Sequence, residues 1–345
     1  MNEARNDDQT TAAHNRRSLT YEILGTLAEI EEIATAWDAL LDQSPCNRAF
    51  SCASWFLVSC KLNNALTPYV IVARRGEEVA GVLPLVLINE GSSAVFASEL
   101  SDYNDIVARE DDHSVPAGLI EYALSSAAGH RRVILARVRA DSNCWRAARA
   151  LHLADDFDHV CEGHSRHIQL PSNYEEFLRT RSSNLRKSLG RACRNAEKDC
   201  VAVHELKPES FPPSRLPEAF LSLNFDRWGP ESYYELPFPR SFVRKVLPQL
   251  FAEGRMRAFA LMKDERLLGV DLCMVGRNSL CTWNGGFLAE AEKWSPGNLL
   301  MAAGIKAACA AKLEEYDLLR GNESYKTRWA NGIRRLGRLE LDVRA

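Results

Sequence analysis

The sequence predicts a mixed α/β (α+β) fold in which one order of strands and helix is used twice. Each copy contains two strands joined by a short turn, a third strand, a helix and a further strand. A short turn joins antiparallel strands, whereas a strand–helix–strand crossover favours parallel neighbours, so each copy should form a mixed sheet. A repeat of this size indicates a duplicated domain rather than a solenoid.

The first copy begins with a hairpin over residues 67–88, formed by TPYVIVARRG and EEVAGVLPLVLI. Its turn is expected at Arg75 and Gly76. SAVFASEL follows as the third strand, SVPAGLIEYALSSAAG as the helix and RRVILARV as the strand after it.

The second copy repeats this order from residue 256. MRAFALMK and RLLGVDLCMV are expected to pair across Asp264 and Glu265, and SLCTWNGGF is the third strand. SPGNLLMAAGIKAACAAKL is the expected helix and YDLLR the short strand after it. Pro171 lies in HIQLPSNYEEF, just before a new helix, and marks the expected boundary. We therefore expect an N-terminal domain over residues 19–170 and a C-terminal domain over residues 171–345.

Composition narrows the class of protein. A chain of 345 residues suits two domains, and 46% hydrophobic with 26% charged residues is typical of a soluble globular protein. A net charge of -3 argues against a protein dedicated to nucleic acid, and no apolar run approaches the ~20 residues of a membrane span. The ten cysteines are scattered without a CxxC pair, which favours a reducing, cytoplasmic location. Residues 1–18 are polar and lack the apolar core of a signal peptide, so a disordered tail is expected.

The helix start in KWSPGNLLM has the features of an anion site. Ser295 suits an N-cap, Pro296 suits the first helical position, and Gly297 leaves the helix start without a side chain. Exposed N–H groups and the helix dipole attract anions there. The alternative is an ordinary, well-capped structural helix.

Three meandering strands, a helix with an anion-binding start and a short strand are also the order of the GNAT acyltransferase core. With KWSPGNLLM and YDLLRGNESYKTRWA, the tandem arrangement resembles the bacterial CelD-like acetyltransferases and, more distantly, the Fem peptidoglycan aminoacyltransferases. The resemblance extends from about Ser18 onward and implies tandem GNAT-like domains with an acyl-CoA as co-substrate. WSPGNLL keeps only part of the usual Arg/Gln-x-x-Gly-x-Gly/Ala loop. The cofactor-binding residues would be Ser295, Gly297, Asn298 and Leu299.

Three residues are candidates for catalysis. The Tyr/Phe-Lys pair of the related families lies by the acyl-transfer site, which implies that role for Tyr325 and Lys326. Both are expected in a polar loop, where Lys326 could stabilise an oxygen and Tyr325 could act as an acid or hydrogen-bond donor. Asp271 is the only charge in an apolar strand, and burial would raise its pKa toward that of a useful base. The alternative for Tyr325 and Lys326 is a surface loop with solvated charges. The alternatives for Asp271 are a structural pair with an arginine and a side chain that points outward.

The remaining candidates would bind the acceptor. They are polar, charged or aromatic side chains in loops and on one basic helix: Asn284, Arg328, Asp226, Arg227, Trp228, Asp102, Tyr103, Arg186 and Lys187. ELSDYNDIV is expected where the first domain's CoA loop would lie. Its carboxylates would repel pyrophosphate, so that domain is expected to have lost cofactor binding and to hold the acceptor. Each of these candidates also has a structural explanation. The alternatives to acceptor binding are packing within loops, an Asn-Gly turn at Asn284 and a solvated basic helix face.

The predicted function is transfer of an acyl group, expected to be acetyl, from acyl-CoA to an amine or hydroxyl. The resemblance implies a small-molecule or glycan-precursor acceptor from polysaccharide or cell-envelope synthesis. One alternative is a Fem-like aminoacyltransferase that uses aminoacyl-tRNA, with the basic helix as its grip. Another is a GNAT-like scaffold without catalysis. No metal is expected, because no HExxH or comparable ligand spacing occurs. The acyl group, the acceptor and the oligomeric state are not specified by the sequence.

Overall fold

The computed structural model describes residues 18–44, 50–97, 100–125 and 130–343. The expected disordered tail therefore lies outside the described residues except for Ser18. In the first half, the strands are β1 (Leu19–Leu24), β2 (Thr67–Arg75), β3 (Glu78–Ile88), β4 (Ser93–Phe96), β5 (Val107–Ala108), β6 (Arg132–Arg139) and β7 (Cys161–Gln169). The helices there are α2 (Leu27–Leu41), α3 (Ala53–Leu62), α4 (Ser114–Ser125), α5 (Asn143–Ala150) and the short 3-10 helix η1 (Phe157–Val160).

The second half follows the same plan. Its strands are β8 (Val201–Leu206), β9 (Met256–Lys263), β10 (Arg266–Val275), β11 (Ser279–Phe287), β12 (Glu315–Arg320) and β13 (Gly332–Asp342). Its helices are α6 (Tyr174–Arg179), α7 (Ser183–Lys198), α8 (Leu216–Trp228), α9 (Pro237–Ala252), α10 (Pro296–Ala310) and α11 (Ser324–Trp329). The 3-10 helices are η2 (Pro213–Arg215), η3 (Gly229–Glu231), η4 (Tyr233–Glu235) and η5 (Ala289–Trp294).

The expected mixed sheet is confirmed. β2 pairs antiparallel with β3, and β9 pairs antiparallel with β10. Across each crossover helix the strands are parallel, β4 with β6 and β11 with β12. The order of elements is repeated, which confirms the tandem arrangement.

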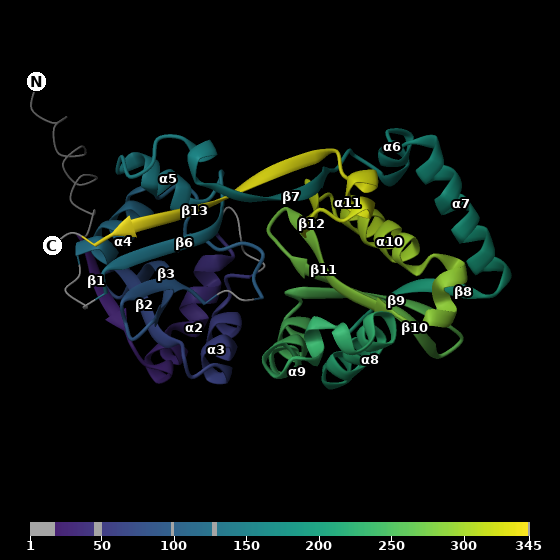
Figure 1. Ribbon diagram of the computed structural model, residues 1–345, viewed down its shortest axis with the longest axis horizontal. Coiled ribbons are helices and arrows are strands. Elements are labelled where there is room, and N and C mark those ends of the chain that lie inside the picture. The colour runs from purple at the N-terminus through teal and green to yellow at the C-terminus, as the bar shows by residue number, and fades with distance from the viewer. Residues whose placement is uncertain (1–17, 45–49, 98–99, 126–129, 344–345) are drawn as a thin grey trace, which may run out of the picture.

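The two halves exchange their last strands, and this was not expected from the sequence. All strands belong to one 13-stranded sheet, in which the order at the centre is β4-β6-β13-β7-β12-β11. β7 follows the first half but pairs with β12, whereas β13 ends the second half but pairs with β6. β7 and β13 also pair with each other, and in Figure 1 they span the middle of the molecule. Each half therefore completes its sheet with a strand from the other.

Helices cover both faces of this sheet. On one face α2, α3, α8 and α9 bury their apolar sides in a single core shared by the halves, and they lie along the lower side in Figure 1. Trp55 of α3 belongs to this core and contacts Phe242 of α9, with ring centroids 4.8 Å apart. On the other face, α4 and α5 form a core with the first half, and α7 and α10 form another with the second. The halves are thus joined both by strands and by one common core.

A buried polar cluster also links the halves. Asp317 of β12 is fully buried and accepts hydrogen bonds from the Tyr103 hydroxyl at 2.8 Å and from the Leu319 N–H at 2.7 Å. The guanidinium of Arg334, on β13, donates to the same carboxylate at 2.9 Å. Tyr103, a candidate for acceptor binding, is therefore buried, and its hydroxyl bonds to another side chain of the protein.

Tyr103→Phe is expected to lower the free energy of unfolding by about 1.5–3 kcal/mol, since it removes one donor from a buried carboxylate while the ring still fills its space. Urea denaturation measures this change. Tyr122→Phe is the matched control, because the Tyr122 ring stacks on Tyr21 and its hydroxyl has no hydrogen bond within the described residues. Equal stability of Tyr103→Phe and the parent protein would contradict the assignment.

Candidate functional site

A cleft of about 710 Å³ opens in the second half where two parallel strands separate. β11 and β12 pair only from Ser279 to Cys281, although β11 continues to Phe287. The walls come from β10, β11, β12, the end of α8, the start of α10 and α11, and Asp102 enters from the first half. Ten further candidate residues line the cleft: Asp271, Tyr325, Lys326, Ser295, Gly297, Asn298, Asn284, Arg328, Arg227 and Trp228.

The start of α10 differs from its prediction at one residue. Ser295 is not a side-chain N-cap: its backbone is left-handed (φ 55°, ψ 59°) and its side chain makes no capping hydrogen bond. The reason is that η5 runs directly into α10, and the Ser295 N–H closes η5 by donating to the Glu292 carbonyl at 2.9 Å. A Cβ built on Gly297 would meet no atom within 4 Å, so the helix start faces open space. Leu299 is buried in the core and does not line the cleft.

Asp271 is the buried carboxylate that the sequence indicated. Its side chain accepts hydrogen bonds from the Thr282 hydroxyl at 3.0 Å and from the Cys273 thiol at 3.3 Å. Burial raises the pKa of Asp271 from 3.8 to about 6, although both hydrogen bonds and Arg227 oppose this rise. The Asp271 side chain is itself buried, so the outward-facing alternative does not hold.

Asn284 and Gly285 lie within β11 and not in a turn, which corrects the Asn-Gly interpretation. Gly285 is opposite Asp271 in the register, and a Cβ there would lie 2.7 Å from the Val270 carbonyl oxygen. The next residue, Gly286, allows α8 to approach the strand, because a Cβ would meet the Leu223 backbone at 2.4 Å. The glycines therefore serve close packing beside the carboxylate.

Lys326 and Tyr325 lie on α11, so the expected polar loop is a short helix. The helix is held by Trp329, which is buried and stacks on Phe177 with centroids 6.3 Å apart. Lys326 is only 4% exposed. Its ammonium donates to the Arg320 carbonyl oxygen and pairs with Glu323 at 3.2 Å. Burial raises the pKa of Tyr325 above its ordinary value.

The candidates Asp226, Arg227 and Trp228 lie on the last turn of α8 and not in a loop. The Arg227 guanidinium lies 4.6 Å from the centroids of both the Trp228 and Phe287 rings. Trp228 is 56% exposed at the cleft. Asp226 does not line the cleft and accepts the Ala289 N–H at 2.7 Å.

The loop containing Asp102 and Asp105 is not at the first half's equivalent helix start, which corrects that expectation. The Asp105 carboxylate accepts the Asn143 and Cys144 N–H groups at the start of α5, at 2.9 and 2.8 Å. Asp102 instead accepts from Arg320 of the second half at 2.8 Å. The carboxylate that lies at the start of α4 belongs to Asp112.

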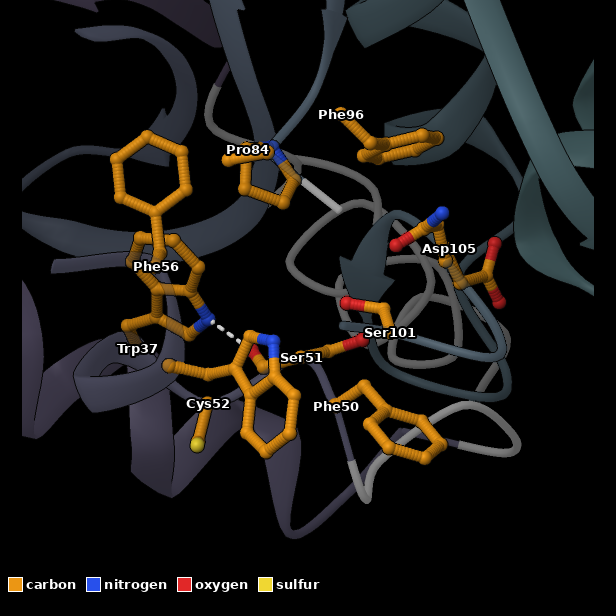
Figure 2. Close-up of a pocket in the computed structure, with 12 residues that line it drawn as sticks. Trp37, Phe50, Ser51, Cys52, Phe56, Pro84, Phe96, Ser101 and Asp105 are labelled. Carbon is orange, nitrogen blue, oxygen red and sulfur yellow. Dashed lines mark hydrogen bonds between the residues drawn. The ribbon is translucent and has the colours of Figure 1, made fainter. Parts of the chain in front are cut away.

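Asp112 occupies the position that an anion would take at α4. It accepts from the Ser114 hydroxyl at 2.7 Å and the Val115 N–H at 3.4 Å, and it pairs with Arg75. A separate pocket, lined by residues of α2, α3, β3 and β4 and by none of α4, measures only about 20 Å³. In Figure 2 the rings of Trp37, Phe56 and Phe96 surround it, and the Trp37 indole N–H donates to the Ser51 carbonyl at 2.8 Å.

The basic helix α7 is amphipathic as expected, with an apolar stripe buried against α10. Arg186 and Lys187 are exposed on its outer side and do not line the cleft. Figure 1 shows α7 at the far end of the second half. The structure therefore does not bring these two candidates to the other site residues.

Sequence reasoning missed Arg320, Glu323, Glu292 and Thr282, all of which belong to the cleft. Arg320 ends the strand YDLLR, and a polar residue at the carboxyl end of a parallel strand could have indicated it. Among the described residues, no group of three or more His, Cys, Asp or Glu is arranged to hold a metal ion. Within that same part of the chain, no helix has both the length and the apolar character to cross a membrane.

Comparison with known proteins gives the family of this region. Residues 183–327 match the family model described as acetyltransferase (GNAT) domain. FemX is similar in fold, with a TM-score of 0.62 at 13% identity over 93% of this chain and 96% of that one. L-PGS from Bacillus licheniformis has a TM-score of 0.56 at 12% identity, over 88% and 90% of the two chains. No curated protein matched the sequence. The chain thus contains a GNAT acetyltransferase domain and is an acyltransferase.

Proposed function

We propose, on the premise that residues 183–327 form a GNAT acetyltransferase domain, that the cleft transfers an acyl group from acyl-CoA to an amine or hydroxyl. The observation that carries this proposal is the meeting of three features in one cleft: the open start of α10, Asp271 and Lys326. The acceptor attacks directly, without a covalent enzyme intermediate. Acetyl is the acyl group that the family description favours.

The start of α10 supports acyl-CoA as the donor. The N–H groups of Gly297 and its neighbours begin a 15-residue helix, and the space in front of Gly297 is open to the cleft, where an anion would meet these groups. In this proposal Gly297 and Asn298 hold the pyrophosphate, while Ser295 shapes the turn that exposes them. When bound, acyl-CoA supplies an activated acyl carbon.

Asp271 serves as the general base. A carboxyl with a pKa of about 6 is largely ionised at neutral pH yet binds a proton more readily than an ordinary aspartate. The hydrogen bonds from Thr282 and Cys273 hold the carboxylate in one orientation. It would accept the proton of the attacking amine or hydroxyl, directly or through water.

Lys326 stabilises the negative charge that develops on the acyl oxygen. An ammonium has three N–H donors, and two contacts engage it among the described residues. One donor therefore remains to face the cleft. Because the group is almost fully buried, its charge is weakly screened there.

Lys326→Ala is expected to lower turnover by about 100-fold or more, the range seen when one such donor is removed. Lys326→Met, which keeps the volume without the charge, should show the same loss and separates catalysis from packing. Lys306→Ala is the matched control, because Lys306 is exposed on α10 away from the cleft. Unchanged turnover in both Lys326 variants would remove this residue from the mechanism.

The acceptor is proposed to enter beside Asp102 and the end of α8. Arg227, Trp228, Asn284 and Arg328 then line its path. The resemblance to CelD-like proteins favours a polysaccharide or cell-envelope precursor as the acceptor class, handled in the cytoplasm. The Asp112 carboxylate at the start of α4 supports a first half that has lost cofactor binding.

A second candidate function is aminoacyl transfer from a charged tRNA. The observation in its favour is the exposed basic face of α7, formed by Lys187, Arg191, Arg194 and Lys198. RNA binding there would weaken steeply with salt, because phosphate contacts release counterions.

A further inference from the structure

Two polar side chains that do not line the cleft lie behind the Asp271 carboxylate. Asp271 and Cys273 point to the same face of β10, because side chains alternate along a strand. The Cys273 thiol donates to Oδ2 of Asp271 at 3.3 Å. The Tyr316 hydroxyl, on β12, lies 3.7 Å from the Cys273 sulfur. Cys273 and Tyr316 are fully buried, so they contact the carboxylate from inside the protein.

This chain of hydrogen bonds has one direction. A thiol carries a single proton, so a sulfur that donates to Asp271 can only accept from Tyr316. Burial raises the pKa of Cys273 and the pKa of Tyr316 well above their ordinary values, so both groups keep their protons at neutral pH. The hydrogen bonds therefore run from the Tyr316 hydroxyl to the sulfur, and from the thiol to the carboxylate.

Helix α10 leaves room for the Tyr316 hydroxyl at Gly304. A Cβ built on Gly304 would lie 2.4 Å from the hydroxyl oxygen, so a larger residue there would displace it. Tyr316 belongs to the apolar core that α7 and α10 form with the second half. A buried hydroxyl is costly unless it is hydrogen-bonded, and the Cys273 sulfur meets that requirement.

A β-bulge brings Thr282 to the same carboxylate. The pairing of β10 with β11 shifts between Leu272 and Cys273, so that Trp283 is the extra residue of β11. Thr282 consequently lies opposite Cys273, on the face that carries Asp271. Its hydroxyl lies 3.0 Å from Oδ1 and 3.1 Å from Oδ2. Without the extra residue, Trp283 would take this place on the face.

The two oxygens of the Asp271 carboxylate are bonded differently. Oδ2 accepts from both Cys273 and Thr282, whereas the bond printed for Oδ1 is the one shared with Thr282. Oδ1 lies toward Gly285, where a Cβ would be 3.3 Å from it, and Gly285 lines the cleft. Oδ1 is therefore the oxygen placed to take a proton from the acceptor, and Oδ2 is the anchored one.

The other ionisable groups that face Asp271 come from helices at the cleft. They are Arg227 of α8 and Tyr325 of α11. An arginine keeps its charge at neutral pH, and burial raises the pKa of Tyr325, so this tyrosine stays neutral. Neither group changes its charge in the range where Asp271 titrates. A change in the pKa of Asp271 therefore reports on its hydrogen bonds.

We propose that Tyr316 and Cys273 form a hydrogen-bond relay that anchors Oδ2 of Asp271 and favours the ionised carboxylate, which leaves Oδ1 to accept the proton. The action of this carboxylate as a base rests on the proposed function, whereas the relay itself does not. Both are positioning residues. Because the Tyr316 hydroxyl contacts the sulfur, its effect on Asp271 should depend on the presence of Cys273.

Carbon-13 NMR of the full chain labelled at its aspartate carboxyl carbons measures the pKa of Asp271 without a substrate. The resonance of Asp271 is the one missing from Asp271→Asn. Cys273→Ala should raise this pKa by about 0.5 pH units, because the ionised form loses a donor. Tyr316→Phe should raise it less. The double variant should match Cys273→Ala, since Tyr316 acts through the sulfur. Cys273→Ser restores a donor and should return the pKa toward the parental value.

Cys309→Ala is the matched control, because Cys309 is a buried thiol of the same core, and none of the described contacts joins it to Asp271. It should leave the pKa of Asp271 unchanged. An unchanged pKa in Cys273→Ala overturns the relay, and so do single effects that add in the double variant. If Cys273→Ala does not fold, Tyr316→Phe decides, and an unchanged pKa in that protein overturns the relay.

The pH profile of kcat/KM, measured in the same variants, separates the relay from the proposed function. The rise in kcat/KM with pH should be displaced by the same amount as the pKa measured by NMR. A displaced NMR pKa with an unchanged rate profile would refute Asp271 as the base but not the relay. An unchanged NMR pKa would refute the relay and leave the base assignment standing.

Discussion

Asp271→Asn is expected to lower kcat/KM by about 100-fold or more, because it removes the proposed general base while preserving shape. In the parent enzyme, kcat/KM should rise with pH through about 6, since the carboxyl must lose its proton to act. The residual kcat/KM of the variant should not show this rise with pH. A pH profile of initial rates with a saturating acyl donor measures both effects.

The same substitution should stabilise the protein above pH 6. The folded-state pKa of about 6 exceeds the ordinary value of 3.8, so the free energy of unfolding falls as the pH rises between these values. The loss amounts to about 3 kcal/mol once the carboxylate is fully ionised. Asp271→Asn avoids it, and urea denaturation should show a gain about twice as large at pH 8 as at pH 5.

Asp264→Asn is the matched control for both measurements. Asp264 lies in the turn of the same hairpin, is exposed, and has a φ of 52° that asparagine tolerates. It should change neither activity nor its pH dependence. An Asp271→Asn protein with parental rates would exclude Asp271 as the base.

Gly297→Glu is expected to abolish acyl-CoA binding without harming the fold. The site has room for a side chain, and a carboxylate in the first turn of α10 interacts favourably with the helix dipole. It also repels the pyrophosphate that the helix start would hold. In the parent protein, CoA at ~100 times its dissociation constant should add roughly 2.7 kcal/mol and raise the unfolding midpoint by roughly 4 °C.

Thermal unfolding with CoA, acetyl-CoA and longer acyl-CoAs measures this shift, and the preferred chain length identifies the acyl group. Gly297→Gln is the matched control, because it adds the same volume without the charge and should keep part of the shift. No shift with any thioester in the parent protein would contradict the CoA site. Salt-dependent binding of tRNA would then favour the aminoacyl-transfer alternative, and its absence a scaffold without catalysis.

Local patterns in the sequence were sufficient for the repeated core. Turn residues at Arg75–Gly76 and Asp264–Glu265 indicated both hairpins, and the crossover rule indicated the parallel pairs. The exchange of β7 and β13 left no such signal, because pairing between strands far apart in the chain depends on register and not on local composition. The expected separate sheets were therefore replaced by one.

The site was predictable to the same extent. A single charge in an apolar strand identified Asp271 as buried, and its role as a base stays a prediction. Ser295 was misassigned because a capping residue and a left-handed turn residue look alike in sequence. Asp102 lines the cleft and Tyr103 donates to the buried Asp317 through contacts with the second half, so neither position follows from local sequence.

The exchanged strands also affect how the chain folds as it is synthesised. Arg132 of β6 and its partner Glu340 of β13 are 208 residues apart. The β6 edge of the first half therefore stays unpaired until almost all of the second half has left the ribosome. Unpaired strand edges promote aggregation, and pairings of such long range form slowly. The nascent chain thus exposes the unpaired edge of β6 for most of its synthesis. A chaperone that shields this edge would act on the first half before the cleft has formed.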